Sequence, residues 1–434
     1  MIFNPHKLGV HKVLQYIPWM GRLLDIQHQA RVRQAVNIAD LRNIARGRAH
    51  KMVFDYLDGG ADDEITLRRN KDAFSQHEMH YKVLSGIQPP LDLSTNILGM
   101  DVQLPFFACP TAGNCMFHHQ GETAVAKASH QRNMLYAMSC LSTTSLPQIQ
   151  NEYPKPGKVF QLYVWKDRQI VKDLLQEAKR HNFTALALTV DVSWMGNRER
   201  DPRNGFTVPP NYTLQQTIQA MQRPAWTFDF LSRKPYAYAC FNKDVPADSM
   251  AQFINSQLTP DFSWHDAEWL LGEWNLPHTA IKGVVRPDDA VTAKQVGFST
   301  VWISNHGGRQ LETAPATIDV LPQIRHAVGP DMGIILDGGI QRGTDIAKAI
   351  ALGANGVGIG KPYLWGLAAG GQAGVEKAFD ILHRELDRAM GLLGTPTIAD
   401  LQREGPNLIQ KRQGSVRDYP DRYAHDRGYG GGVV

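Results

Sequence analysis

A histidine and an arginine three residues apart form a pair whose types and spacing suit a chemical reaction in this 434-residue chain. They are His306 and Arg309, in the stretch Ser-Asn-His-Gly-Gly-Arg-Gln-Leu-Glu of residues 304–312. An imidazole accepts a proton near neutral pH, and a guanidinium binds a carboxylate through two parallel hydrogen bonds. Gly307 and Gly308 allow the backbone to approach a ligand closely. A base beside a carboxylate-binding group is what oxidation of a 2-hydroxy acid requires.

A short apolar run precedes this stretch and predicts a buried parallel strand. It is one of a series of strand-length runs that alternate with helical patterns from about residue 100 onward. The runs are Leu104–Cys109, Met134–Cys140, Lys158–Val164, Ala185–Val192, Thr279–Val284, Thr300–Asn305, Gly333–Gly339 and Gly356–Lys361. This alternation predicts a (β/α)8 TIM barrel, whose parallel strands are apolar because both faces are buried. A doubly wound open sheet is the alternative, but no Gly-x-Gly-x-x-Gly turn follows the first strand.

Three segments are expected along the chain: a helical N-terminal extension over residues 1–36, the barrel over 37–400, and an extended or flexible tail over 401–434. Residues 193–278 separate the fourth and fifth strands, an insertion far longer than an ordinary crossover. An insertion at this face would cover the active site, contact another subunit, or touch a membrane, because aromatic residues lie beside Arg233 and Lys234. Residues 12–24 mix aromatic, leucine and basic residues. They suit either a membrane surface or a packed helical arm.

Composition excludes several classes of partner and location. The formal net charge is +4 without a lysine or arginine block, so no nucleic-acid partner is expected. The four cysteines lack Cys-x-x-Cys spacing, which predicts reduced thiols in a cytoplasmic setting and neither a disulfide framework nor a metal site. No apolar segment is long enough to span a bilayer, and Asn4 and Pro5 interrupt any secretory signal.

Polar residues end most of the predicted strands, and strand C-termini share one face of a barrel. They are Thr111, Ala112, Ser139, Gln161, Tyr163, Thr189, Asp191, Lys282, Ser304, Asp337, Gly360 and Lys361. Singly, Gln161 or Thr189 would be an ordinary satisfied group, and Lys282 a solvated tip. Together they suit a planar cofactor rich in heteroatoms. The glycine-rich ends of the last two strands suit a phosphate, with Arg342 and Lys361 as its charges.

Residues 304–312, with Asp337–Asp345 and Phe160–Tyr163, carry motifs that resemble the FMN-dependent L-2-hydroxy acid oxidases and dehydrogenases. The similarity runs from about residue 37 to about residue 400. It implies FMN as cofactor, and His306 as the catalytic base that Asp191 orients and makes more basic. It also implies substrate contacts, which are made by Tyr56, Tyr163, Arg198 and Arg309.

The same resemblance implies which residues contact the flavin. They are Pro110, Thr111, Ala112, Ser139, Gln161, Thr189, Lys282, Ser304, Asp337, Gly338, Gly339, Gln341, Arg342, Gly360 and Lys361. Lys282 would bring positive charge to the ring edge where reduced flavin gains negative charge. Gln341 and Lys361 depart from the family pattern, because many members carry arginine at both positions.

Two further features bear on substrate and electron acceptor. Leu141 stands where glycolate oxidases carry tryptophan, which favours L-lactate over glycolate. The long insertion is similar to that of bacterial respiratory L-lactate and (S)-mandelate dehydrogenases, in which this region is associated with the membrane and electrons go to quinone. We therefore expect quinone or another respiratory carrier as acceptor, a homo-oligomer (a tetramer by resemblance), and a peripheral location on the inner face of the cell membrane.

Other functions stay open at this point. The main alternative is an oxidase that uses oxygen and produces hydrogen peroxide. Minor alternatives are a flavin-dependent isoprenoid diphosphate isomerase and a non-catalytic flavin-binding protein. An isomerase needs no second arginine for a carboxylate, so Arg198 together with Arg309 argues against it.

Overall fold

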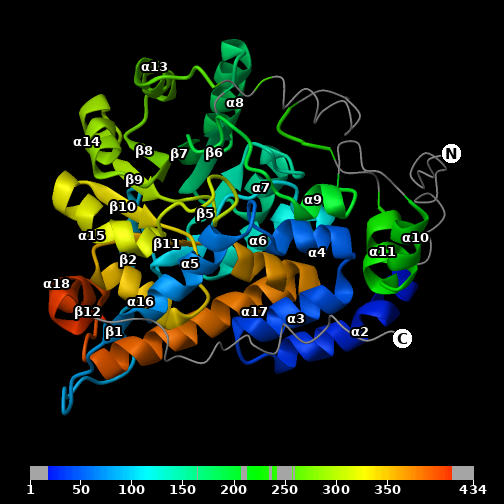
Figure 1. Ribbon diagram of the computed structural model, residues 1–434, viewed down its shortest axis with the longest axis horizontal. Coiled ribbons are helices and arrows are strands. Elements are labelled where there is room, and N and C mark those ends of the chain that lie inside the picture. Colours follow the sequence, from blue (N-terminus) through cyan, green and yellow to red (C-terminus); the bar gives the residue numbers. More distant parts are fainter. Residues whose placement is uncertain are drawn as a thin grey trace.

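The computed structural model describes residues 18–163, 165–206, 213–233, 237–241, 257 and 260–412 (Figure 1). Its centre is a closed barrel of parallel strands, as the sequence predicts. The strands are β4 (Phe106–Ala108), β5 (Tyr136–Ser139), β6 (Lys158–Tyr163), β7 (Phe183–Thr189), β8 (His278–Val284), β9 (Thr300–Ile303), β10 (Gly333–Leu336) and β11 (Gly356–Ile359). Each pairs with the next in sequence, and β11 pairs with β4 to close the barrel.

The barrel has two buried layers. Phe107, Val159, Trp302 and Ile335 belong to a cluster that joins different strands and fills the interior, where Phe107 and Trp302 meet edge to face at 5.3 Å between ring centroids. A larger cluster fills the space between the strands and the surrounding helices. Because both faces of each strand are covered, the strands are predominantly apolar and show no regular alternation of polar residues.

Helices follow most of the strands and begin at sequence signals that favour helix starts. They are α6 (Gly121–Gln131), α7 (Leu146–Glu152), α8 (Arg168–Arg180), α14 (Pro287–Val296), α15 (Thr317–Val328), α16 (Gly343–Ala351) and α17 (Lys361–Leu393). Asp167 caps α8 by accepting the backbone N–H of Gln169, and proline occupies the first turn of α14. The α15 helix begins at Thr317, directly after Ala316, whose backbone is extended.

The N-terminal part wraps one side of the barrel with further helices (Figure 1). They are α2 (Pro18–Gln34), α3 (Ile38–Arg48), α4 (Lys51–Asp58) and α5 (Ile65–Ser75). The α2 and α3 helices pack against α17, and the loop between α4 and α5 reaches the barrel mouth. The expected helical arm is therefore packed on its own domain through α2, and residues 1–17 lie outside the described part.

The chain between β7 and β8 forms the long insertion that the sequence predicts. Its described helices are α9 (Arg200–Arg203), α10 (Leu214–Met221), α11 (Pro224–Leu231) and α13 (Trp264–Trp274). The α11 helix packs against α2 and α10, at the right of Figure 1. Lys234, one of the basic residues expected beside a membrane, lies outside the described residues.

The start of the C-terminal tail differs from the expectation of an extended or flexible segment. Residues 398–408 form α18 (Ile398–Leu408), and β12 (Ile409–Lys411) pairs antiparallel with β1 (His77–Met79). Thr397 caps α18 through the backbone N–H of Asp400, and Leu401 and Leu408 are buried. Buried apolar side chains and strand pairing therefore fix a stretch whose polar composition suggested a tail. Residues 413–434 lie outside the described part.

Two smaller elements complete the described chain. A short hairpin of β2 (Thr95–Ile97) and β3 (Met100–Val102) precedes the barrel, and the 3-10 helix η1 (Asn114–Met116) follows β4. Among the described helices, none has the length and apolar character needed to cross a membrane.

Candidate active site

His306 lies just beyond the C-terminal end of β9, beside Asp191 from the end of β7. Its Nδ1 is 3.1 Å from Oδ1 of Asp191, and its backbone N–H donates to Oγ of Ser304 over 3.1 Å. The His306 backbone is in the left-handed region, with a φ of 56°, which is uncommon for a residue other than glycine. The strand end, the serine and the aspartate together fix where the imidazole points.

Burial sets the protonation state of this pair. Burial lowers the pKa of His306 below its usual 6.5, and the Asp191 charge, which acts to raise it, does not overcome this effect. Burial also acts to raise the pKa of Asp191, but the neighbouring His306 and Lys282 lower it overall. The expectation that Asp191 makes His306 more basic therefore holds for the pairwise interaction and not for the net pKa. The imidazole is a free base at neutral pH and is ready to accept a proton.

Arg198 and Arg309 lie on the same side of the cavity as His306. Arg309 donates from Nη1 to the backbone oxygens of Tyr56, at 2.5 Å, and Gly59, at 3.3 Å, and its Cζ lies 4.8 Å from the centre of the Tyr56 ring. Arg198 donates to Oε1 of Gln310 over 3.0 Å and to the Arg309 carbonyl over 3.4 Å. Burial, followed by the Arg198 charge, lowers the pKa of Arg309 to about 10. Arg309 therefore keeps its positive charge at neutral pH.

Lys282 is a buried cation at the end of β8. Its Nζ donates to Oγ of Ser304 over 2.9 Å and lies 3.0 Å from Oδ2 of Asp337. Asp337 also accepts from the indole N–H of Trp302 over 2.9 Å and from Ser304 over 2.7 Å. Burial opposes the charge on Lys282, but Asp337 and Asp191 raise its pKa overall. The network keeps a permanent positive charge beneath the cavity.

The glycine-rich ends of β10 and β11 form another part of the cavity wall. Gly338 and Gly339 have φ values of 99° and 86°, which favour glycine. Lys361 is partly buried and lines the same cavity, and its Nζ donates to the backbone oxygens of Asp58 and Gly59 at 2.6 and 2.9 Å. Burial lowers the pKa of Lys361 to about 7, although Asp58 acts to raise it.

Arg342 is not brought to this cavity. Its Nη1 pairs with Oε1 of Glu385 on α17 at 2.7 Å, and 44% of its side chain is exposed. The segment after β10 turns into α16 at this point, and the side chain follows the outside of the turn. Gln341, the preceding residue, does line the cavity. Of the two side chains predicted to bind the phosphate, Lys361 therefore lies at the cavity and Arg342 lies outside it.

One cavity of about 400 Å³ at the C-terminal end of the barrel gathers most of the predicted residues. Its lining includes Tyr56, Pro110, Thr111, Ala112, Tyr163, Arg198, Lys282, His306, Arg309, Asp337, Gly338, Gly339, Gln341, Gly360 and Lys361. Other predicted residues support the lining from beneath or behind. Gln161 donates to Thr189 Oγ1 over 2.9 Å, and Ser139 accepts the backbone N–H of Leu141 over 3.1 Å. Ser304 and Asp191 act through Lys282 and His306.

Sequence reasoning missed several residues that shape this site. Asn305 and Asn70 exchange a reciprocal pair of hydrogen bonds of 2.8 Å, which join the His306 loop to α5. Gln310 donates from Nε2 to the carbonyls of Asp191 and Trp194, both at 2.9 Å. Asp201 lines the cavity as well. Gln310 and Asp201 both follow predicted site arginines closely, which was the available signal. The partner of Asn305 lies 235 residues away, and no local pattern predicts it.

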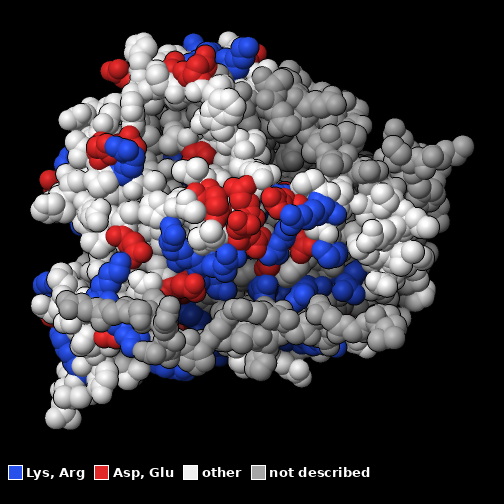
Figure 2. Space-filling model, in the orientation of Figure 1, with Lys and Arg blue, Asp and Glu red and all other residues white. Residues whose placement is uncertain are grey.

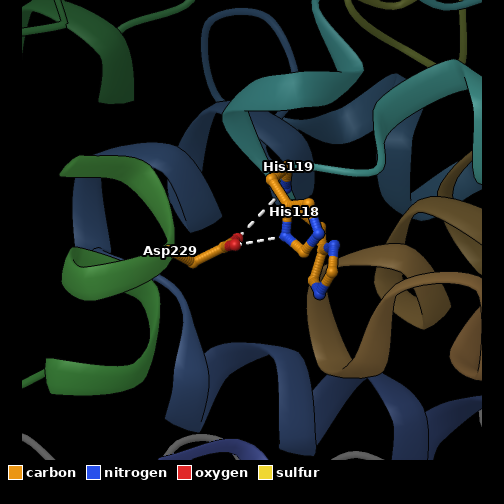
Figure 3. Close-up of side chains that lie close together, drawn as sticks. All are labelled: His118, His119 and Asp229. Atoms are coloured by element: carbon orange, nitrogen blue, oxygen red, sulfur yellow. Dashed lines mark hydrogen bonds and ion pairs between the residues drawn. The ribbon is translucent and has the colours of Figure 1, made fainter. Parts of the chain in front are cut away.

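A second group of polar side chains lies away from this cavity, where His118 and His119 approach Asp229 of α11 (Figure 3). Their ligand-type atoms lie within 4.8 Å of one another. The carboxylate pairs with His119 Nδ1 and accepts the His119 backbone N–H over 3.1 Å, and the two imidazole rings stack at 4.5 Å. This group was not predicted, because Asp229 is distant in sequence from the two histidines.

Arg48 completes this second group and decides its character. Its Nη2 is 3.6 Å from Asp229, and its Nε donates to Asp25 of α2 over 2.9 Å. Burial acts to raise the pKa of Asp229, but His118, His119 and Arg48 lower it well below its usual range. Burial lowers the pKa of His118 to about 3, so that ring is neutral. Because Arg48 of α3 contacts both Asp25 of α2 and Asp229 of α11, the group ties these three helices together.

A parallel barrel with a base, two guanidiniums and a glycine-rich segment at its C-terminal face defines a class of barrel enzymes that handle anionic substrates and phosphate-bearing cofactors. Comparison with known proteins identifies the class more narrowly. Residues 45–408 match the FMN-dependent dehydrogenase family, and the chain belongs to that family. It is an oxidoreductase that acts on CH–OH donors and oxidises 2-hydroxy acids with FMN.

Several relatives illustrate the range of the family. An L-lactate oxidase of Nostoc sp. is 38% identical over 376 residues, covering 85% of this chain and 97% of the relative. Glycolate oxidase 3 of Oryza sativa subsp. indica is 36% identical over 368 residues, covering 85% and 95%. The crystal structure of the monotopic membrane protein (S)-mandelate dehydrogenase superposes with a TM-score of 0.83 at 32% identity, covering 87% of this chain and all of that one.

The residues of the cavity fit FMN. Within the described part of the chain, the buried Oε1 of Gln161 has no hydrogen-bond partner, and a heteroatom-rich ring would supply one. A Cβ added at Gly307 or Gly360 would meet no other atom within 4 Å, so both glycines face open space. Lys282 gives a buried cation, and Lys361 with Gly338–Gly339 gives a charge and backbone donors suited to phosphate.

Proposed function

We propose that the protein oxidises an L-2-hydroxy acid, with L-lactate favoured, to the 2-oxo acid and passes the electrons to quinone or another respiratory carrier. The observation that carries the proposal is the Asp191-held imidazole of His306 in one cavity with two guanidiniums. An α-carboxylate on the guanidiniums would bring the substrate hydroxyl and Cα–H to the imidazole. This combination matches the chemistry of a 2-hydroxy acid more closely than that of an uncharged alcohol.

Each residue has a proposed role in that reaction. Arg309 and Arg198 bind the substrate carboxylate, and the Tyr56 and Tyr163 hydroxyls orient it within hydrogen-bonding reach. His306 accepts the proton that the substrate loses, and Asp191 stabilises the imidazolium that forms. FMN, when bound, accepts the two electrons. Lys282 is the cation that balances the negative charge arriving with them.

Apolar side chains close the cavity around the position expected for the substrate's side group. Leu141, Met195, Phe206 and Tyr238 line it, and Phe206 lies 4.6 Å from Tyr56 between ring centroids. Leu141 leaves more room than the tryptophan of glycolate oxidases. This supports a substrate with an apolar side group, and L-lactate over glycolate. A panel from glycolate through L-lactate to L-mandelate, followed by anaerobic bleaching of the flavin, ranks these substrates.

A membrane surface is the proposed location, on the inner face of the cell membrane, because two helices expose apolar faces. Trp19, Leu23 and Ile26 of α2 are 57–63% exposed at helical spacing. Leu214, Ile218 and Met221 repeat the pattern on α10. The α10 and α11 region carries little charge in Figure 2, whereas charged side chains crowd the centre of that face. The similarity to a monotopic membrane dehydrogenase adds support.

The acceptor is tested by comparing two second half-reactions on the same enzyme. Quinone reduction and oxygen-dependent peroxide production are measured with L-lactate at equal enzyme concentration. The proposal expects quinone turnover to exceed peroxide formation by at least about tenfold. Fast peroxide formation without quinone turnover would instead support the alternative, a hydroxy acid oxidase. That alternative has its own observation, the 38% identity to an L-lactate oxidase.

The assembly is proposed to be a homotetramer, by resemblance to the family. Light scattering of the FMN-bound protein in mild detergent gives the molar mass directly. A monomer of 48.5 kDa would contradict the proposal.

A further inference from the structure

Two carboxylates line the active-site cavity, and they have different neighbours. Asp337 is paired with Lys282 at 3.0 Å. Asp201 lies at the substrate side, on α9, in the same lining as Arg198, Arg309 and Phe206. No motif or family resemblance described above gives Asp201 a role.

Backbone hydrogen bonds hold Asp201 in the turn that follows Arg198. Its N–H donates to the Arg198 carbonyl over 2.9 Å, and its carbonyl accepts the Phe206 N–H over 2.8 Å. Arg198 is itself bound to the carbonyl of Arg309 and to Gln310. Burial raises the pKa of Asp201, while the charges of Arg309 and Arg198 act to lower it. Asp201 in turn acts to raise the pKa of the Arg309 guanidinium. The three side chains line the same cavity, and the charge of each acts on the others.

The charge count of this unit defines which substrates it accepts. Arg198 and Arg309 contribute two positive charges, and ionised Asp201 contributes one negative charge. One substrate carboxylate brings the sum to zero. A second substrate carboxylate would leave one uncompensated negative charge in a largely buried site, which is costly. The other cations of the lining come from other elements. Lys282 pairs with Asp337, Lys361 donates to the carbonyls of Asp58 and Gly59, and Lys71 belongs to α5.

We propose that Asp201 is a specificity-determining residue that limits the enzyme to 2-hydroxy acids with a single carboxylate and rejects 2-hydroxy diacids. This inference rests on the proposed function, because it assumes that Arg198 and Arg309 bind the substrate carboxylate. It goes further by assigning the charge class of the substrate to one side chain. Without the negative charge of Asp201, the two guanidiniums can balance a second substrate carboxylate.

The test compares single-carboxylate and double-carboxylate ligands on the FMN-bound protein. Wild type, Asp201→Asn and Asp201→Ser are mixed anaerobically with L-lactate or L-malate, and the rate of flavin bleaching at several substrate concentrations gives a limiting reduction rate and an apparent Kd for each. The limiting rate divided by the apparent Kd is compared between the substrates. The ratio of this value for L-lactate to that for L-malate is expected to fall at least about tenfold in both variants, mainly through a lower apparent Kd for L-malate. Asp201→Glu, which keeps the charge, is expected to retain discrimination within about threefold of wild type.

A matched control and a binding measurement separate charge from structure. Asp63→Asn removes an exposed carboxylate of the loop between α4 and α5, outside the cavity lining, and is expected to leave the ratio unchanged. Dissociation constants for the non-reacting acids propionate and succinate are read from the flavin absorption spectrum without turnover. Succinate binding is expected to tighten relative to propionate in Asp201→Asn.

The outcomes distinguish this inference from the proposed function. If no L-2-hydroxy acid bleaches the wild-type flavin, the proposed function fails, and the propionate and succinate constants still report on Asp201. If L-lactate bleaches the flavin but the ratios of both turnover and binding stay at the wild-type value in Asp201→Asn, the inference is overturned. Equal weakening of the single and double acids would also overturn it, because Asp201 would then only position Arg198 and Arg309.

Discussion

The Nδ1 atom of His306 lies 3.1 Å from Oδ1 of Asp191, although 115 positions separate the two residues in the chain. The barrel brings them together because β7 and β9 flank β8 and all three strands end at the same face. Gln310 strengthens the contact by donating to the Asp191 carbonyl. Orientation of the imidazole is therefore a property of the tertiary fold.

Asp191→Asn is expected to lower kcat/KM roughly 10²–10⁴-fold, the range associated with a positioned general base. The substitution removes the charge that stabilises the imidazolium. The pH profile gives a second readout. Activity requires the free base, and burial lowers the His306 pKa, so the acid limb of kcat/KM should lie below the usual histidine value of 6.5. Because Asp191 acts to raise that pKa, its loss should move the limb to lower pH. An acid limb at the same pH in Asp191→Asn and wild type would contradict the coupling between Asp191 and His306.

Lys361→Gln is expected to weaken FMN binding about 10–100-fold, because the cavity loses the cation beside Gly338 and Gly339. Arg342→Gln is the matched comparison, since Arg342 pairs with Glu385 outside the cavity, and it should change FMN affinity less than about threefold. Dissociation constants come from flavin fluorescence on titration of the apoprotein. Equal losses in the two variants would show that Arg342 also reaches the phosphate.

Replacing Leu214, Ile218 and Met221 together with serine should reduce binding to vesicles of anionic and zwitterionic phospholipid by at least about tenfold. The three side chains form the exposed apolar face of α10, and their burial in lipid would supply the binding energy. Leu392→Ser changes an equally exposed leucine at the end of α17 and is expected to have no effect. Co-sedimentation with the vesicles measures the bound fraction of the triple variant, of Leu392→Ser and of wild type. Equal binding of the triple variant and wild type would remove α10 from the membrane surface.

Asp229→Asn should destabilise the protein by about 3 kcal/mol, the lower end for breaking one partner out of a buried ion pair, because Arg48 keeps Asp25. The direction in which this stabilisation changes with pH follows from the lowered pKa of Asp229. Its stabilisation is present above the usual aspartate pKa and is lost as pH falls through the folded value. The difference in the free energy of unfolding between variant and wild type should therefore decrease in strong acid. Thermal unfolding measures the difference in stability, with exposed Asp63→Asn as a control of no expected effect.

Local patterns predicted the barrel and most of the cavity, for physical reasons visible in particular residues. Most strands are short apolar runs ended by a polar residue, and this pattern predicts that Lys282 and Asp337 lie at the same face of the barrel. The structure brings the two side chains within 3.0 Å. Arg342 shows the limit of that reasoning. Sequence gives its distance from the strand end but not the turn into α16 that directs the side chain to Glu385.

Other features depend on contacts between distant segments. Residues 398–412 look polar, yet β12 pairs with β1 from the beginning of the chain. The net pKa of His306 depends on burial by the whole barrel mouth, which outweighs the nearby Asp191. The group of His118, His119, Asp229 and Arg48 draws on three segments that lie far apart in the sequence.

Anaerobic mixing of FMN-bound protein with an L-2-hydroxy acid tests the central claim most directly. Wild type should lose its flavin absorbance near 450 nm with L-lactate or L-mandelate and keep it with the D-enantiomer. His306→Asn should retain the flavin and bleach at least about 10³-fold more slowly, because the base is absent. Wild-type protein that holds FMN and is bleached by no L-2-hydroxy acid, or a His306→Asn variant that bleaches at the wild-type rate, would contradict the account.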